Sequence, residues 1–141
     1  MIRLAINSKG DPAGVLGVAR KRMRDGFRAM VEALAESAKK TSPVRTGKLR
    51  DSVGHSSGTA FSGSVVYGAP YASFLHEGTG LYGPHGKIIV IRPKKGKALF
   101  WPGAAHPVSV VRQKGIRPRD FVWRAIREAR LAESFDGAFN D

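Results

Sequence analysis

The 141-residue sequence contains no cysteine, and this absence removes several kinds of chemistry. Disulfide bonds, thiolate metal sites and cysteine nucleophiles are all excluded. Long apolar runs are missing too, since no segment approaches the ~18 to 20 apolar residues that a membrane-spanning helix needs. The N-terminal residues also lack an apolar run of signal-peptide length. We therefore expect a protein with no membrane span.

Acidic residues are scarce, with 11 Asp and Glu against 24 Lys and Arg. Between residues 39 and 114 the only carboxylates are Asp51 and Glu77, which is thin support for a metal-dependent nuclease. His76 precedes Glu77, but Gly80 stands where a zinc-protease helix needs its second histidine. The Gly-Lys pairs lack the following Ser or Thr of a phosphate loop. The sequence therefore predicts no metal site, no cofactor and no enzyme.

The formal net charge is +13, and it is spread along the chain. A field of this sign attracts nucleic acid, anionic surfaces or acidic proteins, but it does not determine the fold. Arg20, Arg24 and Arg28 recur every four residues, so on a helix they form a ridge that faces solvent, DNA or an acidic neighbour. The candidate residues for contact with a partner or DNA are Arg20, Arg24, Arg28, Arg45, Lys48, Arg50, Lys94, Lys95 and Lys97.

Apolar periodicity predicts a long helix near the N-terminus and a second helix near the C-terminus. The first runs from about Val15 and should end by about Thr41, because Pro43 disfavours helical backbone at the residue before it. The second begins near Pro118. Two further helical turns are expected over 71–77, with Phe74 and Leu75 buried. Gly78 should end them in a backbone conformation that is costly for other residues, as a positive φ is.

Short strands are predicted between these helices. Residues 87–92 contain four consecutive apolar β-formers and are the predicted centre of the sheet, with 98–101 as hairpin partner. The other extended segments are 1–7, 49–57, 62–68 and 106–113, with 49–57 and 62–68 forming a hairpin. The length suits one domain over 1–141, with an N-terminal strand and loop at 1–14 and a loose acidic tail at 134–141.

Three short segments stand out in order along the chain. They are 42–52, at the junction between the first helix and the hairpin, then 71–79, and then 117–121 at the start of the last helix. Their distinctive residues are Pro43, Gly47, Tyr71, Gly78, Thr79, Pro118 and Phe121.

Together these segments resemble the small head-tail joining or tail-completion proteins of long-tailed double-stranded DNA bacteriophages, often catalogued as minor tail components. The resemblance covers roughly residues 15 to 130. It implies an α+β fold, in which the N-terminal and C-terminal helices pack on a small, mostly antiparallel sheet. Two features depart from the family: Asp120 stands where a second proline is common, and the segment 83–111 is longer and more basic.

The resemblance implies a structural protein of the phage neck that catalyses no reaction. It implies a homo-oligomeric ring around the DNA channel, sixfold like the tail tubes of this phage class, between portal or connector and tail-tube or tail-terminator proteins. Such a protein belongs to the virion and assembles in the host cytoplasm. The alternative is a nucleic-acid-binding protein without enzymatic activity, whose basic residues follow phosphates while Trp101 or Tyr82 stacks on bases.

Overall fold

The structure is a computed structural model of the protein, and it describes residues 1–7, 17–58 and 61–140. The predicted loop at 8–14 lies outside the described residues. The chain divides into two compact units: unit 1 comprises 1–72 and 120–141, and unit 2 comprises 73–119. The single domain over 1–141 stays a prediction.

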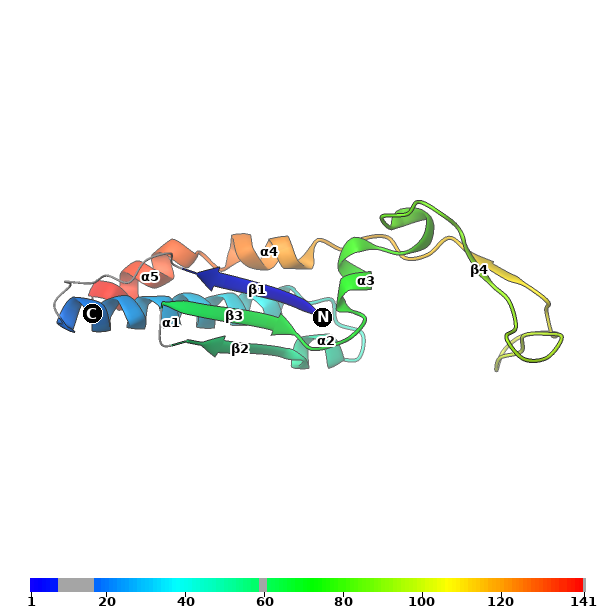
Figure 1. The fold of residues 1–141 in the computed structure, drawn as a ribbon, viewed down its shortest axis with the longest axis horizontal. Helices are drawn as coiled ribbons and strands as arrows, with labels where there is room; N and C mark the ends of the chain where they lie inside the picture. The colour runs from blue at the N-terminus through cyan, green and yellow to red at the C-terminus, as the bar shows by residue number, and fades with distance from the viewer. Residues whose placement is uncertain (8–16, 59–60, 141) are drawn as a thin grey trace. The chain divides into compact units, whose positions relative to one another are not determined.

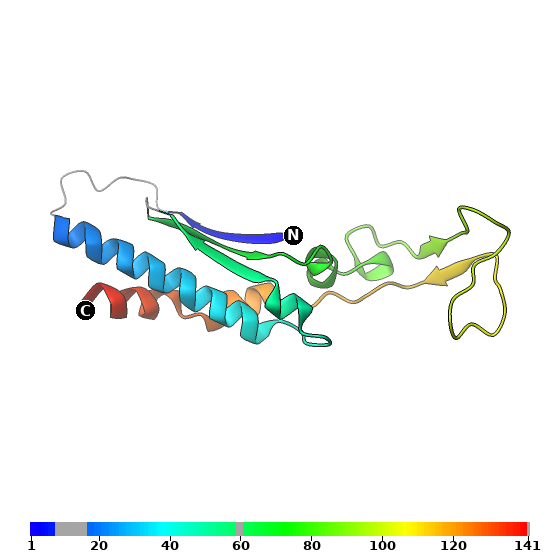
Figure 2. The ribbon, with the colours of Figure 1, turned by 90° about the horizontal axis from the view of Figure 1, so that it is seen from below.

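Unit 1 is organised around α1 (Gly17–Thr41), which confirms the predicted long helix and its end before Pro43. The side chains of Val31, Leu34 and Ala38 are buried on this helix, as its apolar stripe predicts. The helix contacts the sheet as well as the two C-terminal helices (Figures 1 and 2). The predicted α+β class is therefore confirmed.

The sheet of unit 1 has three antiparallel strands in the order β1-β3-β2. They are β1 (Ile2–Asn7), β2 (Val53–Ser57) and β3 (Ser62–Tyr67), and the predicted hairpin of the last two is confirmed. In β3 the alternate residues Gly63, Val65 and Tyr67 are buried, which is the period of a strand with one face on a core. At Gly63 a Cβ would collide with Cγ2 of Val31, so the absence of a side chain lets α1 lie close to β3.

The predicted start of the second strand at Leu49 is wrong. Residues Lys48–Asp51 form α2, a single helical turn, and β2 begins only at Val53. Gly47 precedes the turn with a φ of 79°, a left-handed conformation that favours glycine. The amide of Asp51 donates to the Gly47 carbonyl at 2.9 Å and closes the turn, which leaves Leu49 buried.

The C-terminal helices are α4 (Phe121–Glu128) and α5 (Leu131–Asn140). The helix predicted near Pro118 is present, and its apolar residues Val122 and Ala125 are buried. The loose tail from residue 134 was a wrong prediction, because residues 134–140 belong to α5. The ring of Phe135 lies against Gly26 of α1 and meets the Phe27 ring edge-on, with 5.7 Å between centroids.

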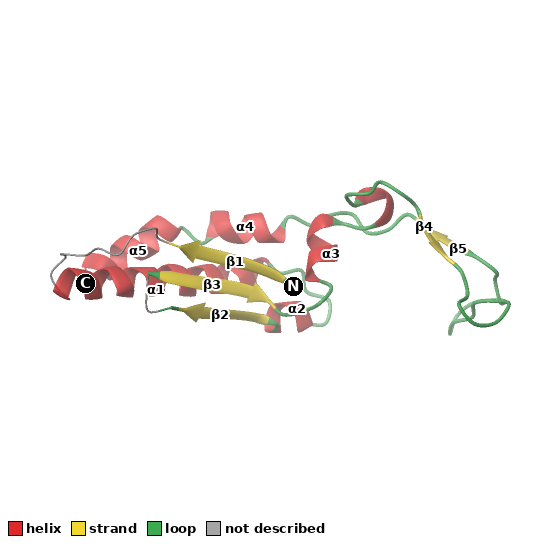
Figure 3. Ribbon diagram, viewed as in Figure 1, coloured by secondary structure: helices red, strands yellow, loops and turns green. Residues whose placement is uncertain are grey.

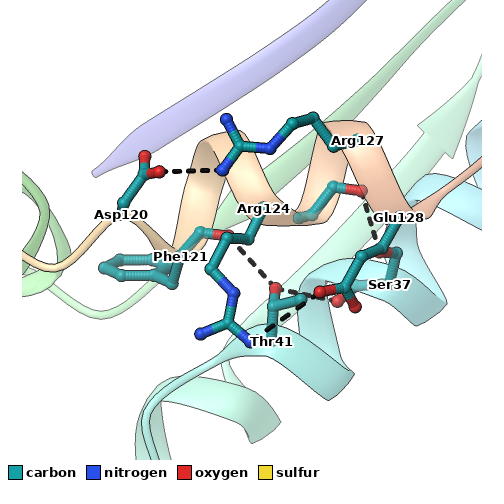
Figure 4. Close-up of polar contacts among 8 residues, drawn as sticks. Ser37, Thr41, Asp120, Phe121, Arg124, Arg127 and Glu128 are labelled. Carbon is teal, nitrogen blue, oxygen red and sulfur yellow. Dashed lines mark hydrogen bonds and ion pairs between the residues drawn. The ribbon is translucent and has the colours of Figure 1, made fainter.

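Polar contacts join α1 to α4 (Figure 4). The Ser37 hydroxyl donates to the Ala125 carbonyl at 2.8 Å. The Thr41 hydroxyl lies 2.9 Å from the Ser37 carbonyl oxygen and 3.1 Å from that of Phe121. Beside them the Tyr67 hydroxyl donates to the Ala38 carbonyl at 3.3 Å, and burial raises the pKa of this phenol. Each of these three hydroxyl groups, which an apolar core would otherwise leave without a hydrogen-bond partner, therefore has a backbone carbonyl as its acceptor.

Unit 2 holds most of α3 (Ala72–Glu77), the short 3-10 helix η1 (Gly80–Tyr82) and a separate two-stranded sheet. Its strands, β4 (Ile89–Ile91) and β5 (Val111–Gln113), are antiparallel, with Ile89 opposite Gln113. Loops make up most of the rest (Figure 3). The predicted helical turns at 71–77 are confirmed.

Two strand predictions for unit 2 are wrong. The apolar run at 87–92 is not the centre of the main sheet, and its partner is β5 rather than 98–101. Leu99 instead forms an isolated bridge to Val108, and the predicted extended piece at 106–113 contains β5. Four consecutive β-formers predict a strand, but they do not identify the chain segment that pairs with it.

We predict that the hydrogen bond from α1 to α4 stabilises unit 1. The substitution Ser37→Ala should lower the free energy of unfolding by about 1 kcal/mol, because it removes a buried hydrogen bond of ordinary strength. Urea denaturation measures this change. The control is Ser57→Ala in β2, where the side chain is exposed and little change is expected. Equal stabilities for the two variants would contradict the prediction.

Candidate interaction surfaces

Within residues 1–7, 17–58 and 61–140, no group of three or more His, Asp or Glu is placed to hold a metal ion. No helix in this part of the chain is both long enough and apolar enough to cross a membrane. Charged and apolar surfaces are the candidate functional features of these residues.

The basic ridge of α1 lies beside the end of β2 and the start of β3. Arg24 and Arg28 are exposed, whereas Arg20 is half-buried. The two exposed arginines border an open hollow of about 340 Å³, together with the rings of Phe27 and Phe61. Lys21, Asp25, Ser57, Gly58 and Ser62 complete its lining. The tertiary structure thus brings the ridge next to the described residues at one end of the β2–β3 hairpin, an association that helix periodicity does not reveal.

The basic residues of the junction form a second group. Arg45, Lys48 and Arg50 are exposed, and the Arg50 Nε lies 2.9 Å from Oδ1 of Asp51. An ion pair this exposed adds little to stability. Since α1 rises by 1.5 Å per residue, its end at Thr41 lies roughly 25 Å along the axis from Arg24. The ridge and the junction are therefore separate basic sites.

Backbone hydrogen bonds hold the two ends of unit 2 together in what we call the glycine clasp, formed by residues 78–83 and 114–118. The amide of Thr79 donates to the Ile116 carbonyl at 2.9 Å, and the amide of Leu81 donates to the Lys114 carbonyl at 2.8 Å. In return, the Ile116 amide donates to the Thr79 hydroxyl at 2.9 Å. The clasp therefore holds together the two ends of the segment 84–113, which lies between its two halves.

Glycine is required in the clasp because the two segments touch. Gly78 has a φ of 79°, and a Cβ there would lie 2.9 Å from the Ile116 carbonyl oxygen and from Cδ of Pro118. A Cβ on Gly115 would collide with the carbonyl oxygen of Thr79. The structure therefore brings together Gly78, Thr79 and Pro118, from the second and third sequence motifs. The predicted positive φ at Gly78 is confirmed.

The other motif residues lie in unit 1. Phe121 is buried, with its ring 5.3 Å from that of Tyr67, and Gly47 is buried at the junction. Pro43 is half-buried at the end of α1, and Tyr71 is exposed. These residues belong to the fold of unit 1. The sequence identified them as motif residues but did not show which residues they contact, such as Tyr67 for Phe121.

Unit 2, whose residues are all described, buries no hydrophobic side chain. The predicted burial of Phe74 is wrong, since its side chain is 59% exposed, and Leu75 is only half-buried. Seven exposed residues of unit 2 form what we call the apolar set: Ile88, Val90, Ile91, Phe100, Trp101, Val110 and Ile116. The predicted contact residues Lys94, Lys95 and Lys97 are exposed in the same unit. The sequence identified these lysines as candidate contact residues, but it did not predict that the apolar side chains would be exposed.

The family comparison bears on unit 1 and the start of unit 2. Residues 14–78 match the model of the HK97-gp10-like family, described as "Bacteriophage HK97-gp10, putative tail-component". The matched stretch, which is less than half of the 141-residue chain, is similar to this family. The resemblance to a phage tail-completion family is thereby confirmed. No curated protein and no solved structure matched the chain.

The HK97-gp10-like stretch includes α1, the junction with Pro43 and Gly47, the hairpin, and α3. It ends at Gly78, so the ribbon of β4 and β5 and the C-terminal helices lie outside it. The segment 83–111, which the sequence predicts to be longer and more basic than in the family, falls in this second part.

We predict that crowding at Gly78 maintains the clasp. The substitution Gly78→Ala should accelerate hydrogen exchange of the Thr79 and Leu81 amides by about tenfold or more, since a left-handed non-glycine residue costs about 1 to 3 kcal/mol and a collision is added. Gly86→Ala is the matched control, because Gly86 also has a positive φ but no atom lies within 4 Å of its Cβ position. The prediction fails if the two variants exchange at the same rate.

Proposed function

We propose that this protein is a structural component of the phage neck, either a head-tail connector or a tail-completion protein. The HK97-gp10-like match over residues 14–78 carries the proposal. The packing of α1 on a small antiparallel sheet supports it, because this is the architecture that the sequence resemblance implies. The protein then belongs to the virion and is assembled in the host cytoplasm.

The role is structural rather than enzymatic. The histidine that stands beside a carboxylate in the sequence, His76, has its Nδ1 3.3 Å from the Arg119 carbonyl oxygen at the base of unit 2. His76 therefore contacts the backbone of the last residue of unit 2, a contact that joins the two ends of this unit. The protein therefore acts through docking surfaces, and its partners are portal or connector proteins on one side and tail-tube or terminator proteins on the other.

The same proposal includes a closed homo-oligomeric ring of six copies around the DNA channel. Identical subunits close a ring through head-to-tail contacts, in which one surface of each copy meets a different surface of the next. The ridge and the junction lie far apart on unit 1, so in such a ring the two basic surfaces face different surroundings. Duplex DNA in the channel would face part of this positive charge.

The ring predicts a defined position in the virion. Cryo-electron microscopy of the neck should show the protein as a sixfold layer between portal and tail tube. Its presence as scattered copies on the capsid, or its absence from the neck, would refute the proposal. Light scattering of the purified protein should give a multiple of 15.2 kDa without nucleic acid if the ring closes before docking.

A second candidate function is nucleic-acid binding through the ridge, which the hollow beside Arg24 and Arg28 favours. The variant Arg24→Glu/Arg28→Glu tests it against the control Lys39→Glu/Lys40→Glu, which changes the net charge equally. Affinity for a 30-base-pair duplex is measured by fluorescence anisotropy at two salt concentrations. For the neck protein we expect equal losses in both variants, because only net charge matters. A loss of more than about tenfold confined to the ridge variant, with a smaller salt slope, would support the second candidate instead.

A further inference from the structure

Unit 2 has the surface of a docking element and not that of a self-contained domain. Nine of the thirteen large apolar side chains exposed in the described residues lie between residues 73 and 119. Phe100 is 68% exposed and Trp101 46%, near the isolated bridge between Leu99 and Val108. Exposed apolar surface on this scale marks an interaction site, because it is costly to leave in water.

The charge of unit 2 identifies the sign of its partner. Nine Lys and Arg stand against a single carboxylate, Glu77. The lysines of the turn at 94–97 are exposed within a few residues of Phe100 and Trp101. A surface that combines these features is complementary to an acidic surface with an apolar centre.

The apolar set distinguishes a protein partner from DNA. Duplex phosphates are matched by cations and polar groups, whereas Ile88, Val90 and Ile91 offer no contact to them. Most hydrogen bonds between proteins and DNA go to phosphate and sugar, and the aliphatic side chains of β4 offer no donors for them. A packed protein interface buries such side chains and gains free energy in proportion to the apolar area.

A second copy of this chain is a poor occupant for the same surface. Unit 1 carries net positive charge, with ten acidic residues against fifteen basic ones. Several of its carboxylates are already paired with arginines of the same chain, at Arg127–Asp120 (2.9 Å), Arg130–Glu133 (3.3 Å) and Arg124–Glu128 (3.7 Å). Two of these pairs are drawn in Figure 4. The net positive charge and these ion pairs make unit 1 a poor electrostatic match for unit 2.

We propose that unit 2 is a preformed arm that docks on an acidic, apolar-centred surface of a different protein of the particle. The inference rests on the proposed function, and it assigns the arm to contacts between layers of the neck, leaving ring closure to unit 1. The glycine clasp holds both ends of the arm by backbone hydrogen bonds. The Arg117 guanidinium, 5.2 Å from the centre of the Tyr82 ring, adds to this base. An arm held in this way loses less conformational entropy on docking than a free loop.

The test places a photo-crosslinking residue on the arm in cells that produce phage particles. The substitution Trp101→p-benzoylphenylalanine reports from the arm, and Trp123→p-benzoylphenylalanine, at an exposed tryptophan of α4 in unit 1, is the matched control. We expect the residue-101 probe to crosslink to another phage protein, in a segment rich in Asp and Glu, and the residue-123 probe not to reach that segment. Crosslinks from residue 101 mainly to this chain, to DNA, to a basic segment or to nothing would overturn the proposal.

Alanine variants measure how much the arm contributes. Phe100→Ala/Trp101→Ala should reduce the amount of protein incorporated into particles by about tenfold or more, as expected for anchors at the centre of an interface. Trp123→Ala should leave it unchanged. Circular dichroism checks that both variants keep the fold of unit 1. Equal incorporation of both variants would overturn the assignment.

The crosslink and the cryo-electron microscopy distinguish the two proposals. If residue 101 crosslinks to an acidic protein while the neck contains no ring of this chain, the docking arm stands and the neck position is wrong. If the ring is present and the arm crosslinks to its own copies, the neck position stands and the docking partner is wrong.

Discussion

The contact on which unit 1 depends is the close approach of α1 to the sheet. It occurs where Val31 lies against Gly63, a strand position with no side chain to hold the helix away. The same helix accepts Phe135 over Gly26 on its other side, so small residues at two points let one helix serve two layers. Hydroxyl groups on the α4 side are tolerated because each meets a backbone carbonyl. Helix, sheet and C-terminal helices therefore share one core.

The two units are stabilised by different interactions, and this difference organises the function. Every buried hydrophobic residue in the described chain belongs to unit 1, whereas unit 2 depends on backbone hydrogen bonds and glycine crowding at its clasp. A unit that keeps its apolar side chains outside has free energy left to gain from a partner. Under the proposed function, unit 1 provides the framework while unit 2 provides the contact surface.

Sequence reasoning succeeded where local chemistry decides the structure. The period of α1, its end before Pro43, the hairpin and the positive φ at Gly78 follow from side-chain spacing or from backbone conformations that only some residues adopt. It failed at α5, because residues 134–140 become helical in contact with α1 and their acidic, small-residue composition shows no such partner. It also failed at β4, because an apolar run has the same appearance whether its faces are covered or exposed.

By itself, the sequence determined the α+β class, the positions of most helices and strands, the excess of positive charge and the resemblance to phage tail-completion proteins. Each of these depends on residues close together in the chain or on composition alone. Only the tertiary structure decided that Gly78, Thr79 and Pro118 meet, that the ridge borders the hairpin, and that the seven residues of the apolar set stay exposed. These properties depend on contacts between distant segments, and a residue's spacing along the chain carries no information about the partner that covers it.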